Sequence, residues 1–228
     1  MTGGPAVVVM AKVPRPGSVM TRLAPLLGHD GCARLQGSLL WRAAQVASAA
    51  APGAAFLAVA PPGGRSDVED LVPAGIRIVP QVGTHLGERM ASAAGAAFDA
   101  GHAPVVVIGT DVPLLVPGTL RQALATLASG ADVVFGPAVD GGYYLVGLRA
   151  FGPEVFALDP ALWGGPGVLD ASLAASGALG LRAATLEPLR DLDTPEDAAA
   201  LVRDPGLPSG IGQALAAALD RRRPPSTT

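Results

Sequence analysis

The sequence has little of several residue types on which other protein classes depend. Cys32 is its single cysteine, which excludes a disulfide framework and a cysteine metal cluster and fits a reducing, cytoplasmic setting. Lys12 is its single lysine, charged residues make up 15% of the chain, and the net charge is −3. Such a charge argues against nucleic-acid binding driven by phosphate neutralisation. The three histidines, His29, His85 and His102, do not have the spacing of metal ligands.

Long apolar runs and several well-known motifs are also absent. The alanine-rich stretch 43–60 is interrupted by Pro52 and Gly53, well short of a membrane span. No basic segment precedes the first apolar run, so we expect no signal peptide. The chain has no Walker phosphate loop, no Rossmann glycine fingerprint and no Gly-Xaa-Ser-Xaa-Gly nucleophile elbow. We therefore expect a cytoplasmic protein with neither a membrane nor a nucleic acid as its partner.

Short apolar runs alternate with helical patterns along the chain. Strands are predicted at 6–11, 54–60, 76–79, 105–108, 132–135, 143–148 and 181–186. Helical spacing of apolar residues occurs in the segments 35–46, 90–98, 120–127, 168–175, 195–202 and 211–219. This alternation predicts an α/β fold, a single domain over residues 1–220 with a mostly parallel, doubly wound sheet. Residues 221–228 are predicted to be a disordered tail.

One predicted strand ends in a carboxylate. The four β-branched residues 105–108 indicate a strand that is buried on both faces, and they are followed directly by Gly109, Thr110 and Asp111. In open α/β sheets, ligands bind at the carboxyl ends of the strands. Two interpretations of Asp111 are open: it holds a divalent cation against a phosphate, or it has a structural role, as the cap of the helix that begins near Pro117 or as the residue that closes a turn.

The loop after the first predicted strand is rich in cations. Lys12, Arg15 and Arg22 fall within eleven residues, and Gly17 lies between prolines and a serine that shape the backbone. Arginine forks and backbone N–H groups in such a loop can surround the phosphates of a nucleotide. The alternative is a solvated basic loop without a ligand.

A run near the C-terminus carries three aspartates. Thr194 has the position of a helix N-cap and Asp197 that of its capping-box partner. Capping leaves Asp191 and Asp193 unexplained, and two residues apart in an extended segment they would point the same way. Carboxylate oxygens suit a hard cation such as Mg²⁺, which also keeps waters and bridges to phosphates. Asp111 together with Asp193 makes a plausible metal site.

Two glycine-containing segments have both a structural and a functional interpretation. The glycines allow close approach of a ligand, although Asp-Gly is also a common hairpin turn, and the turn is favoured for the group Asp140, Gly141, Gly142 and Tyr143. In the segment 81–89, Gln81 and the glycines, Gly87 among them, either line a base or ribose pocket or form a loop and a helix start.

Taken in order, these stretches resemble a family of bacterial transferases associated with radical-SAM and selenodomain proteins, of the DUF2064 type and often called arsenosugar-biosynthesis glycosyltransferases. Its relatives in the nucleotide-diphospho-sugar transferase (GT-A-like) fold include the 2-phospholactate and molybdenum-cofactor guanylyltransferases. The resemblance covers residues 6–202, and its matching segments are Ala11-Lys12 with Pro14, Pro16-Gly17, Thr21-Arg22-Leu23, Leu86-Gly87-Glu88-Arg89-Met90, Gly109-Thr110-Asp111 with Pro113, Gly136-Pro137, Asp140-Gly141-Gly142-Tyr143-Tyr144-Leu145, and Asp191 with Asp193-Thr194-Pro195-Glu196-Asp197.

The resemblance implies that Asp111 and Asp193 bind the metal, Mg²⁺ or Mn²⁺, and act in catalysis, with the first loop on the nucleotide phosphates. The residues predicted to bind the nucleotide are Lys12, Arg15, Gly17, Arg22, Gln81 and Gly87. Those predicted to bind the acceptor are Asp140, Gly141, Gly142 and Tyr143. Two residues depart from the family, because Met20 stands where lysine is usual and His85 where an acidic residue is usual. Loss of a lysine near the phosphates removes a charge that would stabilise the transition state.

The predicted function is a cytoplasmic, Mg²⁺-dependent transferase with a nucleotide or nucleotide-sugar donor and a small-molecule acceptor. In a glycosyltransferase an acceptor hydroxyl attacks the sugar, whereas in a nucleotidyltransferase of the guanylyltransferase kind an acceptor phosphate attacks the α-phosphorus of a nucleoside triphosphate. A nucleotide-binding module with weakened catalysis is the third hypothesis, and Met20 and His85 motivate it.

Overall fold

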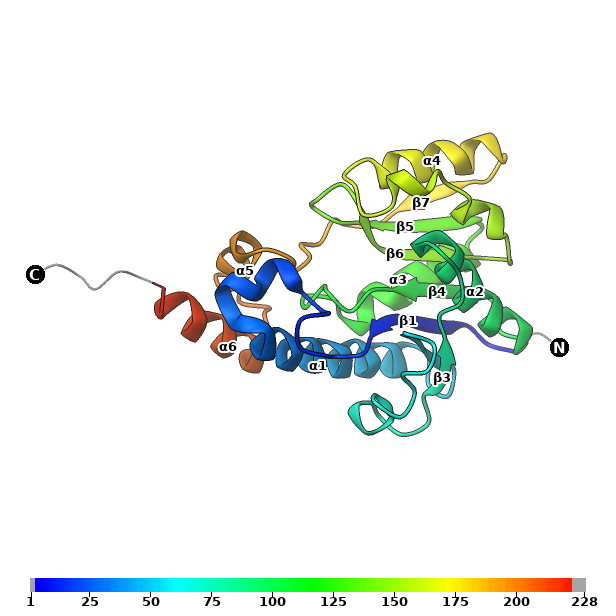
Figure 1. Cartoon of the computed structure of the whole chain (residues 1–228). Coiled ribbons are helices and arrows are strands. Elements are labelled where there is room, and N and C mark those ends of the chain that lie inside the picture. Colours follow the sequence, from blue (N-terminus) through cyan, green and yellow to red (C-terminus); the bar gives the residue numbers. More distant parts are fainter. Residues whose placement is uncertain (1–2, 223–228) are drawn as a thin grey trace, which may run out of the picture.

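The computed structural model describes residues 3–222, and a single seven-stranded sheet forms its centre (Figure 1). The strands are β1 (Ala6–Lys12), β2 (Ala55–Ala60), β3 (Arg77–Pro80), β4 (Val105–Ile108), β5 (Val133–Pro137), β6 (Tyr143–Leu148) and β7 (Ala183–Thr185). Their spatial order is β3-β2-β1-β4-β6-β5-β7, and β6 alone runs antiparallel to its neighbours. The mostly parallel α/β sheet predicted from the sequence is therefore confirmed.

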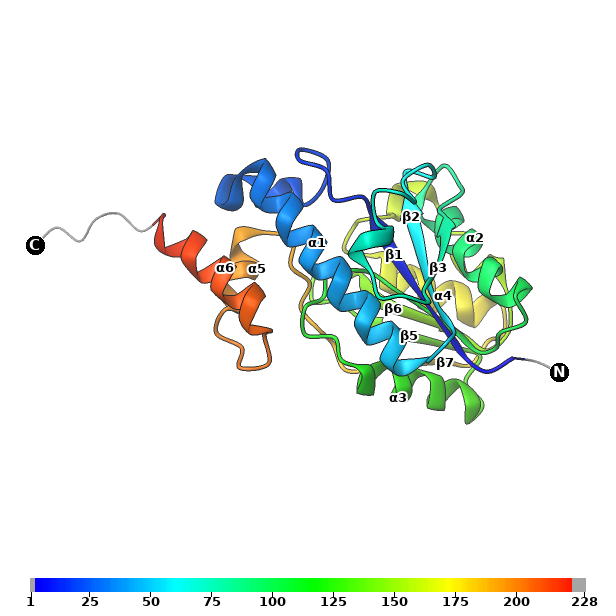
Figure 2. The same cartoon turned by 90° about the horizontal axis from the view of Figure 1, so that it is seen from below.

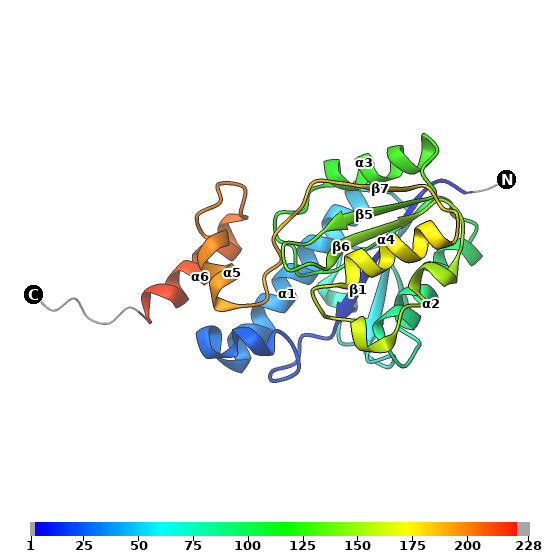
Figure 3. The same cartoon turned by 90° about the horizontal axis from the view of Figure 1, so that it is seen from above.

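Helices cover both faces of this sheet, as a doubly wound fold requires. They are α1 (Ala24–Ala50), α2 (Leu86–Asp99), α3 (Pro117–Ala128), α4 (Val168–Ala178), α5 (Pro195–Leu201) and α6 (Ser209–Asp220). Figure 2 shows α1 and α3 over one face, and Figure 3 shows α2 and α4 over the other. In the described part of the chain, no helix combines the length and hydropathy needed to cross a membrane.

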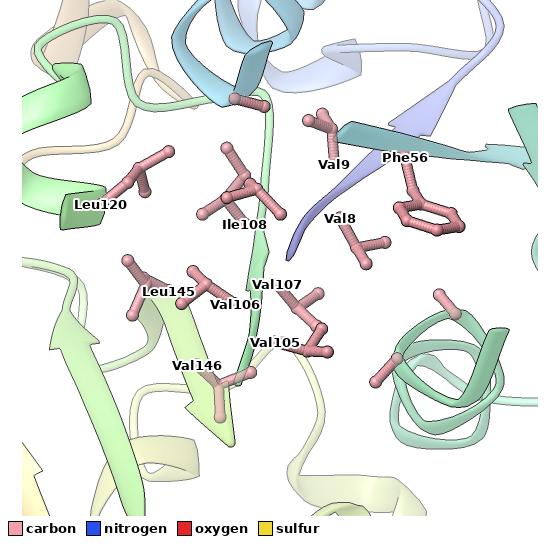
Figure 4. Close-up of a cluster of buried hydrophobic side chains, with 14 of the residues drawn as sticks. Val8, Val9, Phe56, Val105, Val106, Val107, Ile108, Leu120, Leu145 and Val146 are labelled. Atoms are coloured by element: carbon pink, nitrogen blue, oxygen red, sulfur yellow. The ribbon is translucent and has the colours of Figure 1, made fainter. Parts of the chain in front are cut away.

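Strand β4 lies in the middle of the core because its side chains are apolar on both faces. All four of its residues are buried. Successive side chains of a strand point to opposite faces, and in Figure 4 Val106 and Ile108 lie toward Leu120 of α3, whereas Val105 and Val107 lie on the other side. Helices therefore pack against both faces of β4. This packing holds the strand, and with it the residues that follow its carboxyl end, in a fixed position.

A smaller apolar cluster lies beyond the carboxyl edge of the sheet, where α5 and α6 stand beside the N-terminal part of α1 (Figure 1). Leu26 and Leu39 of α1 and Leu215 of α6 belong to it. Leu192 is also fully buried there. Burial of this leucine holds the segment before α5 against the edge of the sheet.

Local structure agrees with the sequence at several other points. The predicted hairpin is present, since β5 and β6 pair antiparallel around the Asp140-Gly141 turn. The predicted capping box is also present: the Thr194 hydroxyl accepts a hydrogen bond from the Asp197 backbone N–H at 3.2 Å. The predicted strand at 181–186 is shorter, because only Ala183–Thr185 pair with β5. The tail predicted to be disordered lies from residue 223 onward outside the described residues.

Candidate active site

The carboxyl ends of β1 and β4 meet at one edge of the sheet. Val9 of β1 stands opposite Ile108 of β4, and the two strands run parallel. Lys12 and Asp111 each follow three residues later, so a cation and a carboxylate reach the same edge. In open α/β sheets, ligands bind at the carboxyl ends of the strands, so this edge is the place where a ligand site is expected.

Gly109 shapes the turn that carries Asp111. A Cβ atom at Gly109 would lie 2.6 Å from Asp111 Oδ1, so the carboxylate folds back over a position that has to lack a side chain. The hydroxyl of Thr110 accepts a hydrogen bond from the Gln36 amide at 3.0 Å, which ties the turn to α1. The interpretation of Asp111 as a helix cap is wrong: Val116 is the N-cap of α3, and no side chain caps it.

A backbone hydrogen bond brings the two acidic segments together. The N–H of Leu192 donates to the carbonyl oxygen of Asp111 at 2.8 Å. Since Leu192 is anchored in the smaller apolar cluster, this bond places Asp193 beside the end of β4. Asp111 and Asp193 consequently line the same cavity, as the sequence predicted. Their role as metal ligands stays a prediction.

This cavity, here called the main cleft, has a volume of about 420 Å³. Its polar lining includes Lys12, Gln36, Gln81, Arg89, Asp111, Tyr143 and Asp193. A neighbouring side cavity of about 560 Å³ shares Lys12, Gln81 and Arg89 and adds Arg15. Cavities of this size hold small ligands and cofactors. The sequence identified Arg89 only as part of a matching segment, and no spacing signal marks it as a second cation of the cleft.

Among the residues predicted to bind the nucleotide, Gln81 has a clear structural task. Its amide nitrogen donates to the carbonyl oxygens of Ala11 at 3.0 Å and Ala58 at 2.9 Å, and thereby joins β1 and β2. The side chain is buried, so its amide N–H groups are already in use. Gln81 therefore holds the floor of the cleft, and its carbonyl oxygen is the polar atom left for a ligand.

Three other residues that were predicted to bind the nucleotide differ in how they relate to the cavities. Arg15 forms an ion pair with Asp67 and lines the side cavity only. Gly17 has a φ of 79° in a turn closed by the Ser18 N–H on the Arg15 carbonyl, which explains the Pro-Gly pair without a ligand. Arg22 donates to Asp193 at 2.5 Å and contacts the cleft through that residue.

Gly87 is enclosed by protein. A Cβ atom there would lie 2.5 Å from both the Phe156 carbonyl oxygen and the Trp163 ring. Gly87 lines neither the main cleft nor the side cavity, so its absent side chain serves packing of the segment 153–163 on α2. Neither cavity therefore offers a nucleotide access to Gly87, and its predicted contact with a nucleotide stays a prediction.

Three carboxylates gather at a third cavity of about 150 Å³, here called the acidic cavity. Asp111, Asp140 and Asp191 line it, together with Tyr143 and Trp163. Asp140 also accepts a hydrogen bond from the Gly142 N–H at 2.8 Å, so it closes the hairpin turn and lines the cavity at once. Both interpretations of this segment are thus compatible with its geometry.

Asp191 and Asp193 do not share one cavity, which differs from the expectation for an extended segment. Asp191 lines the acidic cavity, whereas Asp193 lines the main cleft. Their segment is not paired in the sheet, so regular strand alternation does not apply to it. Arg190, the residue directly before Asp191, donates to Asp197 at 2.9 Å and therefore does not pair with Asp191.

The electrostatics of the site favour positive charge. The side chain of Asp111 is exposed at the mouth of the cleft, but the surrounding residues partly desolvate its carboxylate. This desolvation, with the nearby charges of Asp193 and Asp140, raises the pKa of Asp111. Desolvation and the charges of Asp140 and Asp111 raise the pKa of Asp191 to about 6. A bound cation or several hydrogen-bond donors would relieve these carboxylates.

A divalent cation fits this donor set only with help from a substrate. Within residues 3–222, no group of three or more His, Cys, Asp and Glu side chains is arranged as a metal site. Mg²⁺ is commonly held by one or two carboxylates together with substrate phosphates and water. Asp111 and Asp193 meet that requirement, because both line one cleft beside Lys12.

The two departures from the family pattern lie in different places. Met20 lines the main cleft, and its φ of 48° makes it the one residue other than glycine with a positive φ among residues 3–222. His85 lies at the start of α2, stacked on Trp163 with ring centroids 6.5 Å apart and 3.6 Å from Glu88. Met20 is therefore the substitution that changes the chemistry of the cleft.

Fold and cleft together define the class of the protein, which is that of the nucleotide-diphospho-sugar transferase fold. Within this class, the chain belongs to the family described as "uncharacterized protein conserved in bacteria" (DUF2064), which residues 42–163, more than half of the sequence, match. The DUF2064 family inferred from the sequence motifs is thereby confirmed.

Solved structures share this architecture. A candidate nucleotide-diphospho-sugar transferase from Desulfovibrio desulfuricans G20 is 29% identical, with a TM-score of 0.82 over 97% of this chain and 98% of that one. A cytidylyltransferase from Leptospira borgpetersenii is 11% identical (TM-score 0.55; 95% and 92% covered). Rv0371c from Mycobacterium tuberculosis, solved with manganese, is 17% identical (TM-score 0.52; 87% and 97% covered). No curated protein matches the sequence. The likeness to the Desulfovibrio protein supports a transferase, whereas the two more distant structures show the shared fold alone.

Proposed function

We propose that this chain is a divalent-metal-dependent glycosyltransferase that transfers a sugar from a nucleotide-diphospho-sugar to an acceptor hydroxyl. The observation that supports it best is the Leu192–Asp111 hydrogen bond, which brings Asp193 to the cleft of Asp111. Two carboxylates and the cations Lys12 and Arg89 then surround one cavity. A divalent cation would balance the two carboxylates, and the phosphates of a donor would balance the cations.

Each charged group of the cleft has a role in this proposal. Asp111 and Asp193 would hold Mg²⁺ or Mn²⁺, which supplies positive charge to the departing phosphates when bound. Lys12 at the end of β1 and Arg89 in α2 line the same cleft and would contact the phosphate oxygens. Arg22 neutralises Asp193 in the free protein, and as an exposed ion pair the contact is weak enough to be exchanged for a ligand.

The transfer itself exchanges one bond at the sugar. The acceptor oxygen forms a bond to the anomeric carbon, while the bond from that carbon to the phosphate oxygen breaks. The nucleoside diphosphate leaves with the electron pair, and the hydroxyl proton passes to a carboxylate of the acidic cavity. Asp140 and Asp191, the two carboxylates of that cavity that are not assigned to the metal, are the groups placed to receive it.

Thermal-shift titration of the full chain with nucleotide-sugars and nucleoside triphosphates, with and without Mg²⁺ or Mn²⁺, tests the proposal. We expect metal-dependent stabilisation by a nucleotide-sugar, and Asp111→Asn should abolish it. Asp204→Asn is the matched control, because Asp204 is exposed and lines none of the three cavities. Metal-dependent stabilisation that survives intact in Asp111→Asn contradicts the proposal.

Nucleotidyl transfer is the second candidate, favoured by the single carboxylate at the end of β4 where many glycosyltransferases would carry an Asp-Xaa-Asp pair. Product analysis separates the two: a glycosyltransferase releases a nucleoside diphosphate, whereas a nucleotidyltransferase releases pyrophosphate from a triphosphate. Stabilisation by nucleotides without either product would identify a nucleotide-binding module instead, the outcome to which Met20 in the cleft would contribute.

A further inference from the structure

The segment 109–116, which carries Asp111, has no regular secondary structure. It connects the end of β4 to the start of α3, and none of its residues belongs to a helix or a strand. Gly109 lacks a side chain and Pro113 lacks a backbone N–H, so these groups cannot anchor it. Asp111 itself is exposed. The direction of its carboxylate therefore depends on contacts that other elements make with the segment.

Arg42 of α1 supplies two of these contacts. Its Nε atom donates a hydrogen bond to the carbonyl oxygen of Pro113 at 2.7 Å, and its Nη2 atom donates to that of Leu115 at 3.1 Å. The hydrogen bonds within residues 3–222 give these two oxygens no other donor. A guanidinium is planar and its donors are fixed relative to one another, so it holds both carbonyls in one arrangement.

The geometry points to Arg42 as a positioning residue for Asp111. By holding the carbonyls two and four residues after Asp111, its guanidinium fixes the direction in which the carboxylate faces the main cleft. The inference rests on the proposed function, in which Asp111 binds the metal. It goes beyond that function because Arg42 lines neither the main cleft, the side cavity nor the acidic cavity, so it acts through the segment and not on a ligand.

The other anchors of the segment do not replace Arg42. The side chains of Val112 and Leu115 are buried and hold the segment against the core, but apolar contacts have no preferred direction. The Leu192 N–H bonds the carbonyl oxygen of Asp111 itself. Without Arg42, the backbone after Asp111 would keep its apolar contacts and lose the hydrogen bonds that orient its peptide groups.

The helix that carries Arg42 is a firm support. Its neighbours Leu39 and Ala43 are buried, and α1 lies over the same face of the sheet as α3 (Figure 2). Desolvation by burial lowers the pKa of Arg42, as expected where protein carbonyls replace part of the water around a guanidinium. Among residues 3–222, no carboxylate forms an ion pair with Arg42, so none competes with the two carbonyls.

Metal binding by variants of the full chain tests this inference. The apparent dissociation constant of Mn²⁺ is measured by isothermal titration calorimetry in a fixed excess of UDP, GDP, CDP or ADP, at a temperature where urea curves show every variant to be folded. Contacts that hold metal ligands in place typically change metal affinity by about 10- to 100-fold, so we expect Arg42→Met to weaken Mn²⁺ binding about tenfold or more. Arg42→Lys keeps the charge and can reach one carbonyl, so its loss should be smaller.

Arg121→Met is the matched control. Arg121 of α3 also donates to a carbonyl oxygen, that of Ala49 at 3.3 Å, but it lies outside the segment 109–116 and lines none of the three cavities. We expect its Mn²⁺ binding to equal that of the wild type. Wild-type Mn²⁺ affinity in both Arg42 variants overturns the inference, and so does an equal loss in Arg121→Met.

Hydrogen exchange reads the position of Asp111 without any ligand. The Leu192 N–H is bonded to the Asp111 carbonyl oxygen, and the Val7 N–H is bonded to that of Ala54 in the pairing of β1 with β2. In metal-free Arg42→Met, we expect NMR to show several-fold faster exchange at Leu192 and an unchanged rate at Val7. General destabilisation of the fold would raise both rates, and that result, or an unchanged rate at Leu192, contradicts the inference.

Failure of the inference and failure of the proposed function give different results. If Asp111→Asn abolishes Mn²⁺ binding while the Arg42 variants bind Mn²⁺ as the wild type does, the inference fails and the proposed function stands. If the wild type binds no Mn²⁺ with any of the four nucleotides, the proposed function fails. Exchange at Leu192 then still decides whether Arg42 holds Asp111 in place.

Discussion

Replacing Asp191 by asparagine should stabilise the protein without any ligand. The carboxyl of Asp191 is partly buried beside Asp140 and Asp111, and its pKa is raised from 3.8 to about 6, with desolvation as the largest cause. Below pH 4 the group is protonated in both the folded and the unfolded chain and contributes nothing. Between pH 4 and 6 the unfolded chain ionises first, so stability is lost as the pH rises, and above pH 6 the full cost is present.

The size of this effect follows from the pKa. A difference of about 2 pKa units corresponds to about 3 kcal/mol at 1.36 kcal/mol per unit. Since part of the Asp191 side chain reaches solvent, screening reduces this figure. We expect Asp191→Asn to raise the free energy of unfolding by about 1–2 kcal/mol at pH 8. The gain should shrink to nearly zero at pH 4.

Urea unfolding of the wild type and Asp191→Asn, in EDTA and at several pH values from 4 to 8, measures this difference. Asp204→Asn serves as the control, because an exposed aspartate outside the acidic cavity should show no pH-dependent gain. A stability difference that is independent of pH, or a loss of stability at pH 8, would refute the view that Asp191 is a desolvated charge among like charges.

Two further substitutions separate positioning of the site from stability of the fold. In Gly109→Ala the added Cβ would lie 2.6 Å from Asp111 Oδ1; the carboxylate can rotate away, so we expect a loss of stability below about 1 kcal/mol but a loss of metal-dependent nucleotide stabilisation in thermal-shift assays. Gln81→Leu removes two buried hydrogen bonds between Gln81 and the carbonyls of β1 and β2, and at roughly 1 kcal/mol each we expect chemical denaturation to show about 2 kcal/mol of destabilisation. An unchanged free energy of unfolding in Gln81→Leu would show that these bonds add nothing.

The sequence by itself determined the local elements of this protein. The β-branched run 105–108 has no helical interpretation that fits its length, and it forms β4 with the predicted bounds. Thr194, Pro195 and Asp197 have the spacing of a capping box, and they form one. These features depend on neighbours within a few residues, where side-chain type and spacing are sufficient. The order of apolar runs likewise predicted an α/β sheet, because strands alternating with helices have few other ways to bury both faces.

Only the tertiary structure decided how the polar groups are distributed around the carboxyl edge of the sheet. Asp191 and Asp193 are two residues apart, yet they line different cavities because burial of Leu192 and its bond to Asp111 fix a segment outside the sheet. Arg22 contacts a partner 171 positions away, and Gln81 binds two strands rather than an open pocket. Such pairings are set by the packing of distant segments against one another, and local spacing in a single sequence carries no signal of them.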